Sequence, residues 1–121
     1  MPKVYLTNSF SVNMLPDEKT WVLFMPLDKD AFVARLKEKE FESYIGHEGT
    51  AKLLSILLGK EVEVNRGNLK LQDGDEVYIV VVSERLPEGK VLDENEVKSL
   101  LNAGKVKFWL ATVFDVHRPN A

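Results

Sequence analysis

The segment 76–83, Glu-Val-Tyr-Ile-Val-Val-Val-Ser, constrains the fold of this chain more than any other. It has the length of a strand, follows a turn at Gln72–Asp75, and carries apolar side chains on both of its faces. A strand that is apolar on both faces needs cover on both sides, which predicts a central place in a sheet. The run is too short to cross a bilayer, so we expect no membrane association.

Three segments have the pattern of helices. Asp28 and Asp93 are natural N-terminal caps, and Glu96 stands three residues after Asp93 as in a capping box. A third apolar stripe ends at Gly59, a typical C-terminal stop. We therefore expect helices at about 28–39, 47–59 and 93–104.

Further strands are expected at 4–6, 20–25 and 105–114, with a helical turn within 10–15. The run Thr20–Met25 is continuously apolar and bounded by Pro26, which predicts a buried strand. Because strands and helices alternate without a repeat or a linker, we expect one α/β domain. It would contain a mixed sheet of about five strands covered by helices. The domain is expected to span 1–114 and to be followed by a polar, mobile tail at 115–121.

The composition narrows the function. The 121 residues include no cysteine and two histidines, so disulfides and thiolate sites are excluded and a multi-histidine metal site is not expected. A magnesium site built from carboxylates stays open, but we expect no metal and no cofactor. The net charge of −3 argues against binding long nucleic acids, which favours a small ligand. The N-terminus does not resemble a signal peptide, and we expect a cytoplasmic protein.

His47 is the strongest candidate for chemistry. It lies between Gly46 and Gly49, which let another molecule approach the backbone, and a helix is expected to begin beside it. A helix N-terminus attracts anions, and histidine can donate or accept a proton near neutral pH. The alternative is a histidine that only caps its helix. His117 lies in the polar tail, where we expect no role.

Charged residues near turns supply further candidates. Arg85 and Glu88 follow the central strand, where ligand-contacting side chains often stand. The alternative is a surface ion pair of little consequence. Arg66 is another exposed cation near a turn. Polar residues suited to base or ribose recognition, and equally suited to turns and caps, are Asn8, Ser11 and Asn13.

Together these segments resemble the viral anti-CRISPR ring nuclease family. The likeness covers nearly the whole chain up to about Phe114. The segment 45–50, Ile-Gly-His-Glu-Gly-Thr, resembles the histidine motif of the family, and 83–92 resembles its arginine–glutamate motif. The segments 3–15 and 102–108 fit as well. Positions 81 and 84 depart from the pattern, because Val81 and Glu84 stand where polar, uncharged side chains are expected in some relatives.

The resemblance implies a specific activity. Family members cut cyclic tetra-adenylate, the messenger of type III CRISPR defence, without metal into linear di-adenylates that end in cyclic 2′,3′-phosphates. Related enzymes occur in bacterial CRISPR loci. The resemblance also implies a homodimer, whose two-fold axis matches that of the ring.

The resemblance also implies roles for individual residues. His47 would be the general acid for the leaving 5′-oxygen, and Arg85 would steady the phosphate. Glu88 would orient Arg85 or His47, or assist the hydroxyl. Two alternatives stay open: a protein that sequesters the cyclic nucleotide without cutting it, and a structural viral protein. The implied substrate-binding residues are Asn8, Ser11, Asn13, Thr50 and Arg66.

Overall fold

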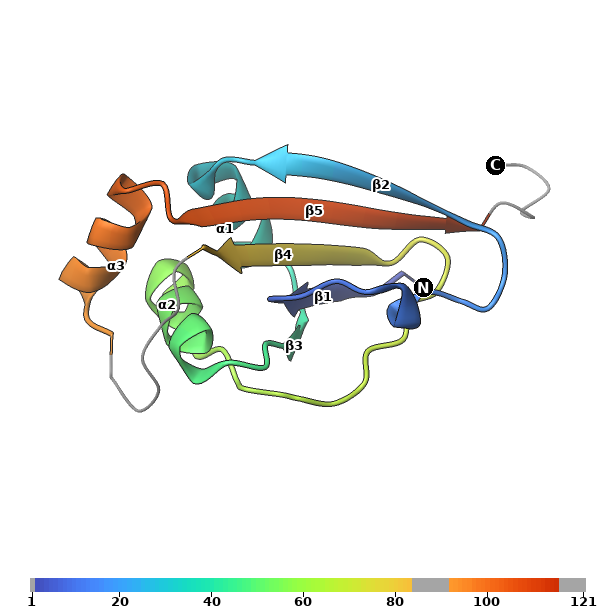
Figure 1. The fold of residues 1–121 in the computed structure, drawn as a ribbon, viewed down its shortest axis with the longest axis horizontal. Coiled ribbons are helices and arrows are strands. Elements are labelled where there is room, and N and C mark those ends of the chain that lie inside the picture. Colours follow the sequence, from blue (N-terminus) through green and yellow to red (C-terminus); the bar gives the residue numbers. More distant parts are fainter. Residues whose placement is uncertain (1, 84–91, 116–121) are drawn as a thin grey trace.

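A computed structural model describes residues 2–83 and 92–115 of the chain, which form a single sheet with helices around it (Figure 1). The expected α/β class, with a mixed sheet of five strands, is confirmed. In chain order, the elements are β1 (Val4–Thr7), the 3-10 turn η1 (Val12–Met14), β2 (Thr20–Leu27), α1 (Lys29–Lys37), β3 (Glu42–Tyr44), α2 (Glu48–Leu58), β4 (Glu76–Val82), α3 (Glu94–Asn102) and β5 (Val106–Asp115).

The sheet has the strand order β2-β5-β4-β1-β3, so β4 is the central strand, as its apolar pattern predicts. β1 runs parallel to both β3 and β4, whereas β5 is antiparallel to β4 and β2. Thr7, the last residue of β1, is in register with Tyr44 of β3 and Ile79 of β4. The carboxyl ends of the three parallel strands therefore lie on the same side of the sheet, where α2 and α3 lie (Figure 1).

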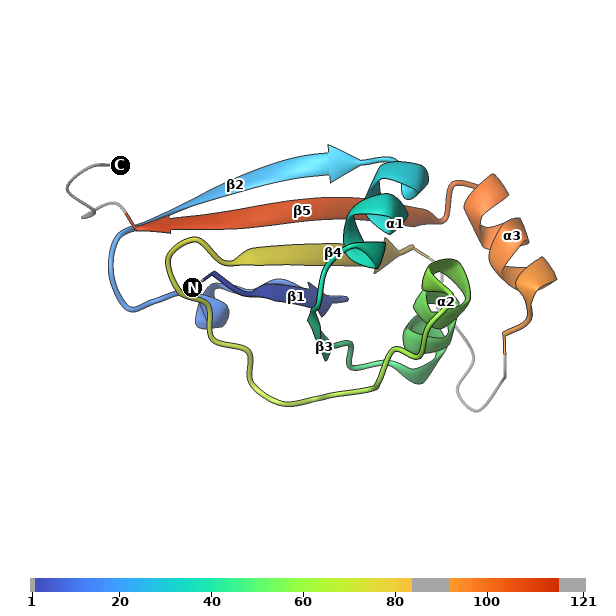
Figure 2. The ribbon, with the colours of Figure 1, turned by 180° about the vertical axis from the view of Figure 1, so that it is seen from behind.

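The two faces of the sheet are covered differently. One face packs against helices, with α1 lying in front of the sheet in Figure 2. In the described ranges no α-helix lies over the other face, and Leu69 and Leu71 from the segment between α2 and β4 cover part of it. The helix-covered core includes Leu6, Phe32, Leu54, Tyr78 and Phe108. The core on the other face includes Tyr5, Val77, Ile79, Ala111 and Val113.

The helix ends follow the local sequence signals. The Asp28 carboxylate accepts the Ala31 N–H at 2.7 Å, and the Asp93 carboxylate accepts the Glu96 N–H at 2.8 Å. Each bond satisfies a backbone donor that the first helical turn leaves unpaired. Gly59 ends α2 with a φ of 69°, a conformation that glycine adopts without steric cost.

The strand β2 is not buried, contrary to the expectation for 20–25. Trp21 is 66% exposed and Leu23 is 60% exposed. β2 is an edge strand that pairs only with β5, and the strand continues through Pro26 to Leu27. An edge strand tolerates proline because its outward-facing N–H groups need no partner in the sheet.

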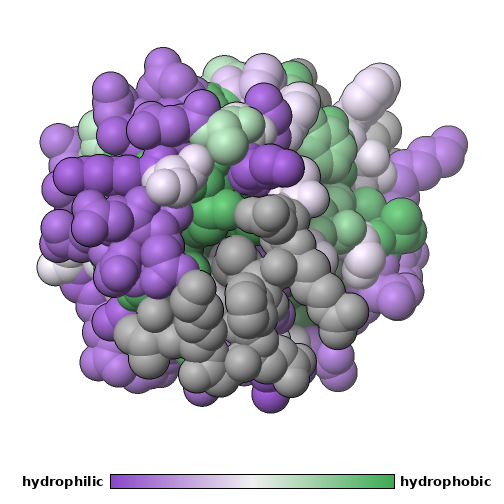
Figure 3. Space-filling view, turned by 60° about the vertical axis from the view of Figure 1, so that its left-hand side comes forward, coloured by the Kyte–Doolittle hydropathy of each residue, from purple (hydrophilic) through white to green (hydrophobic). Residues whose placement is uncertain are grey.

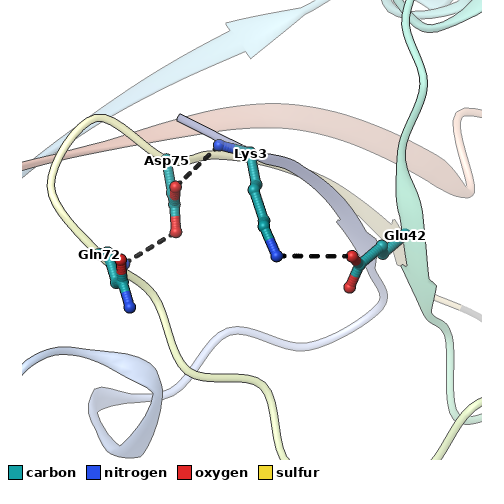
Figure 4. A network of polar contacts seen from close by, with 4 residues as sticks. All are labelled: Lys3, Glu42, Gln72 and Asp75. Carbon is teal, nitrogen blue, oxygen red and sulfur yellow. Dashed lines mark hydrogen bonds and ion pairs between the residues drawn. The ribbon is translucent and has the colours of Figure 1, made fainter. Parts of the chain in front are cut away.

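The start of β1 is fastened to the turn before β4 by a buried carboxylate, which the sequence alone did not reveal. Asp75 accepts the Lys3 N–H at 2.9 Å and the Gln72 N–H at 2.8 Å (Figure 4). Lys3 also extends its ammonium to within 3.9 Å of Glu42. Burial raises the pKa of the Tyr5 phenol, and the charge of Asp75 raises that pKa further.

Candidate functional site

His47 is the N-cap of α2, as the sequence predicts. Its backbone is extended, with φ −129° and ψ 127°, and its side chain is half-buried. The Thr50 N–H donates to Nδ1 over 3.4 Å, a long hydrogen bond. Because Nδ1 accepts this bond, the neutral ring carries its proton on Nε2. Among the described residues, no hydrogen bond engages Nε2.

The topology places His47 beside the carboxyl ends of the parallel strands. Ile45 and Gly46 lead from the end of β3 to His47, and Asn8 directly follows the end of the neighbouring strand β1. In open sheets with parallel strands, ligands characteristically bind at the carboxyl ends of those strands. The sheet thus carries the polar residue after β1 and the histidine after β3 to the same place.

The backbone before His47 is held from two sides. Asn8 accepts the Gly46 N–H on Oδ1 at 2.9 Å. Arg66 donates from Nε to the Gly46 carbonyl, also at 2.9 Å. These contacts join residues that are 38 and 20 positions apart in the chain, so local sequence patterns carry no signal for them.

The segment 63–67 docks against this part of the chain through polar contacts. The Asn65 N–H donates to the Ile45 carbonyl at 2.9 Å, and its side-chain amide donates to the Ser43 carbonyl at 3.1 Å. The Ser43 hydroxyl in turn donates to the Glu63 carbonyl at 2.6 Å. The docked segment brings Arg66 beside Gly46, and the sequence analysis missed Ser43 and Asn65 in this role.

Thr7 is a further residue of the site that the sequence analysis missed. Its buried hydroxyl lies within hydrogen-bonding distance of the Ser9 carbonyl at 2.9 Å and of the Tyr44 carbonyl at 3.2 Å. These contacts fix the turn that begins with Asn8. The polar run Thr7-Asn8-Ser9 is visible in the sequence, where it predicts the end of a strand and makes Asn8 a candidate for substrate binding, but nothing in it singles out Thr7.

The structure brings some of the expected site residues together and separates others. Thr50 contacts His47, and Asn8 and Arg66 contact the adjacent Gly46. Ser11 and Asn13 belong to the η1 region, which lies at the opposite end of β1 from α2 (Figure 1). There the Asn13 carbonyl accepts a bond from the Lys70 ammonium at 2.7 Å. The structure therefore separates Ser11 and Asn13 from His47.

The second expected motif lies outside the described residues. Arg85, Glu88 and His117 belong to the ranges 84–91 and 116–121, so the structure tests neither their roles nor the alternative of a surface ion pair. β4 leads to the first of these ranges. It ends at Val82, on the same side of the sheet as the carboxyl end of β1 and His47. Val81 is 42% exposed near that end.

Two further properties of the described chain bear on function. Across residues 2–83 and 92–115, no three histidine, aspartate, glutamate or cysteine side chains cluster in a way that could hold a metal ion. In the same ranges, no helix is both long enough and apolar enough to pass through a membrane. The visible surface at the end with α2 and α3 is largely hydrophilic, with hydrophobic residues near its centre (Figure 3).

The fold and the site together define a small α/β protein in which a histidine-capped helix begins at the carboxyl edge of the parallel strands. The STIV B116-like family model matches residues 4–110, and the chain belongs to this family. The chain is 38% identical to protein ORF116 of Acidianus filamentous virus 1 (isolate United States/Yellowstone), over 93% of this chain and 97% of ORF116.

Two further relatives agree with this assignment. Protein 26 of Sulfolobus islandicus filamentous virus (isolate Iceland/Hveragerdi) is 32% identical over 74% of this chain and 75% of its own length. The solved structure of B116 of Sulfolobus turreted icosahedral virus superposes with a TM-score of 0.78 and 38% sequence identity. That match covers 93% of this chain and 99% of B116. The expected membership of a family of viral proteins is confirmed at this level.

Proposed function

We propose that this protein is a metal-independent ring nuclease that cleaves cyclic tetra-adenylate and thereby switches off type III CRISPR signalling. The observation that carries the proposal is the placement of His47, whose Nδ1 accepts a backbone bond while Nε2 is free among the described residues. A proton donor beside a helix N-terminus suits a reaction in which an alkoxide leaves a phosphate.

The proposed reaction uses the substrate's own hydroxyl as the nucleophile. The ribose 2′-oxygen forms a bond to the adjacent phosphorus and loses its proton to a base or to water. The bond from phosphorus to the 5′-oxygen breaks, and His47 protonates the departing oxygen. A cyclic 2′,3′-phosphate remains on one side and a 5′-hydroxyl on the other. Two such cuts convert one ring into two linear di-adenylates.

The N-terminus of α2 links phosphate binding to the proton on His47. When His47 takes a second proton at Nδ1, that nitrogen no longer accepts the Thr50 N–H. The existing bond is 3.4 Å long, so little is lost when it breaks. A phosphate oxygen at the helix N-terminus would then accept this N–H and lie beside the protonated ring.

The remaining expected residues complete the proposed site. Arg85 would steady the charge that develops on the phosphate, and Glu88 would orient Arg85 or His47 or assist the 2′-hydroxyl. Contacts to the ribose, base and phosphate groups are assigned to Asn8, Ser11, Asn13, Thr50 and Arg66.

The proposed active species is a homodimer with one ring shared between two chains. A ring of four identical nucleotides has a two-fold axis, and a closed dimer would present one His47 to each of two opposite phosphodiesters. The net charge of −3 leaves one chain with little excess positive charge for four phosphates, whereas two copies of Arg66 and Arg85 supply four cations.

The test is incubation of the protein with an excess of cyclic tetra-adenylate and a metal chelator, followed by chromatography of the products. Multiple turnovers to di-adenylate with cyclic phosphate ends are the expected result. Retention of the intact ring by the protein would support the sequestering alternative. Neither binding nor cleavage would support a structural viral protein.

A further inference from the structure

We infer that Asn8 and Arg66 are positioning residues, which set the orientation of His47 by holding the backbone on both sides of Gly46. The inference rests on the proposed function and extends it. The expected role of these two residues is contact with substrate. In the structure, each of them also forms a hydrogen bond with the backbone of Gly46.

The two hydrogen bonds act on different peptide planes. The Gly46 N–H belongs to the peptide that joins it to Ile45, and Asn8 holds that plane at 2.9 Å. The Gly46 carbonyl belongs to the peptide that joins it to His47, and Arg66 holds that plane at 2.9 Å. The two dihedral angles of Gly46 relate these two planes. Fixing both planes therefore restrains the two dihedral angles of the residue that directly precedes His47.

Glycine makes this restraint necessary. Gly46 has no Cβ to limit its backbone angles, so the chain before His47 would otherwise sample a wide range of orientations. The cap bond of His47 is a poor substitute, because it is 3.4 Å long and must break when Nδ1 is protonated. α2 holds the carbonyl side of His47, which accepts the Ala51 N–H at 3.0 Å. Asn8 and Arg66 hold the peptides that lead into His47 from the other side.

Each positioning side chain keeps other donors for a ligand. Asn8 uses Oδ1 for Gly46, which leaves its amide NH₂, and Arg66 uses Nε, which leaves both terminal NH₂ groups. A Cβ built on Gly46 would lie 3.7 Å from Cγ of Arg66 and 3.9 Å from Oδ1 of Asn8. Both side chains thus border the same small space above Gly46, and a ligand that touches their free ends would brace the backbone before His47.

The first experiment separates positioning from substrate contact at residue 8. Asn8→Ala removes the acceptor of the Gly46 N–H, whereas Asn8→Asp keeps an acceptor but loses the amide donor. With saturating ring in single turnover, Asn8→Ala is expected to lower the rate of cleavage by about 10- to 100-fold, because small misplacements of a catalytic group are costly. Asn8→Asp is expected to restore most of that rate, while its added negative charge raises KM.

Asn102→Ala is the matched control, because Asn102 is exposed at the end of α3, and it should leave kcat and KM unchanged. Equal losses of rate in Asn8→Ala and Asn8→Asp would overturn the inference, since they would assign the effect to the missing amide donor. A change confined to KM in Asn8→Ala would overturn it as well.

The second experiment concerns Arg66 and its dependence on His47. Arg66→Lys keeps the positive charge but cannot reproduce the fork of donors, so kcat is expected to fall more than KM rises. In a His47→Ala background, Arg66→Lys should have little further effect on the slow residual rate, because the group that it positions is absent. An undiminished effect of Arg66→Lys in that background would show that Arg66 acts directly on the substrate.

A measurement without substrate distinguishes failure of the inference from failure of the proposed function. Amide hydrogen exchange of Gly46, followed by NMR in the free protein, should be faster in Asn8→Ala than in the wild type, while Asn8→Asp stays protected. Unchanged exchange in Asn8→Ala would refute the positioning role even in an active enzyme. Faster exchange of Gly46 in Asn8→Ala, in a protein that never cuts the ring, would support the positioning role of Asn8 and refute the proposed nuclease activity.

Discussion

The two edge strands of the sheet, β3 and β2, differ in their side chains: the surroundings of β3 are polar, whereas β2 is apolar and exposed. At the β3 edge, the segment 63–67 lies against the chain, where the Ser43 hydroxyl donates to the Glu63 carbonyl and the Asn65 amide donates to the Ser43 carbonyl. At the β2 edge no further strand is paired in the described chain, and Trp21 and Leu23 are more than half exposed. A long apolar edge is a liability unless something covers it, whereas a clamped polar edge can hold a reactive group still. The comparison assigns chemistry to the β3 edge and association to the β2 edge.

The largest expected effect concerns the histidine of the β3 edge. His47→Ala should lower the single-turnover rate of ring cleavage by about 10²–10⁴-fold, the range typical for loss of a general acid. The fold, checked by circular dichroism, and binding of the ring should be retained. His117→Ala is the matched control and should keep full activity. A loss of less than about tenfold, with chemistry rate-limiting, would remove His47 from this role.

A second effect tests whether the chemistry also draws on the segment after β4. Arg85→Ala should lower kcat by about 10²-fold, since a donor to developing phosphate charge is lost. Arg118→Ala, in the C-terminal tail, should have no measurable effect. Equal activities of the two variants, measured side by side at saturating ring, would exclude Arg85 from the site.

A third effect addresses the β2 edge. Leu23→Glu places a charge among exposed apolar side chains and should weaken self-association through the β2 edge, a contact separate from the ring-sharing dimer, by about tenfold or more. Val64→Glu makes a similar change at an exposed valine near the β3 edge, and it should leave association unchanged. Sedimentation of both variants over a range of concentrations provides the measurement. The division between the edges would fail if Val64→Glu abolished association through the β2 edge and Leu23→Glu did not.

The smallest effect concerns the stability of the β3 edge. Asn65→Ala removes a side chain that donates to the Ser43 carbonyl and accepts the Gly67 N–H. The free energy of unfolding should fall by about 1 kcal/mol, the usual value for such bonds at an exposed position. Asn68→Ala is the control and should stay within about 0.5 kcal/mol of the wild type in urea denaturation. Indistinguishable midpoints for the two variants would show that the docked segment is not held by Asn65.

Local signals explain what the sequence could predict. The capping bonds of Asp28, Asp93 and Gly59 join residues three or four positions apart, so the ends of the helices could be inferred from neighbouring residues. The central place of β4 followed from apolar side chains on both of its faces. His47 at the start of α2 belongs to the same class of short-range signals.

The features that escaped prediction depend on distant partners. β3 has only three residues, and its Glu-Ser-Tyr sequence carries no apolar alternation. The exposure of Trp21 and Leu23 could not be inferred, because a continuous apolar run looks the same in a buried strand and in an uncovered edge strand. The two hydrogen bonds that hold Gly46 come from Asn8 and Arg66, which stand 38 and 20 positions away in the chain. Only the folded topology brings these residues together.

The most direct test of the central claim replaces the leaving 5′-oxygen of cyclic tetra-adenylate by sulfur. A thiolate leaves without a proton, so a substrate of this kind does not need a general acid. The account predicts that His47→Ala cuts the sulfur-containing ring at a rate within about tenfold of the wild type, although its loss on the natural ring lies in the range of 10²–10⁴-fold. An equally large loss on both rings would contradict the assignment of His47 as the proton donor.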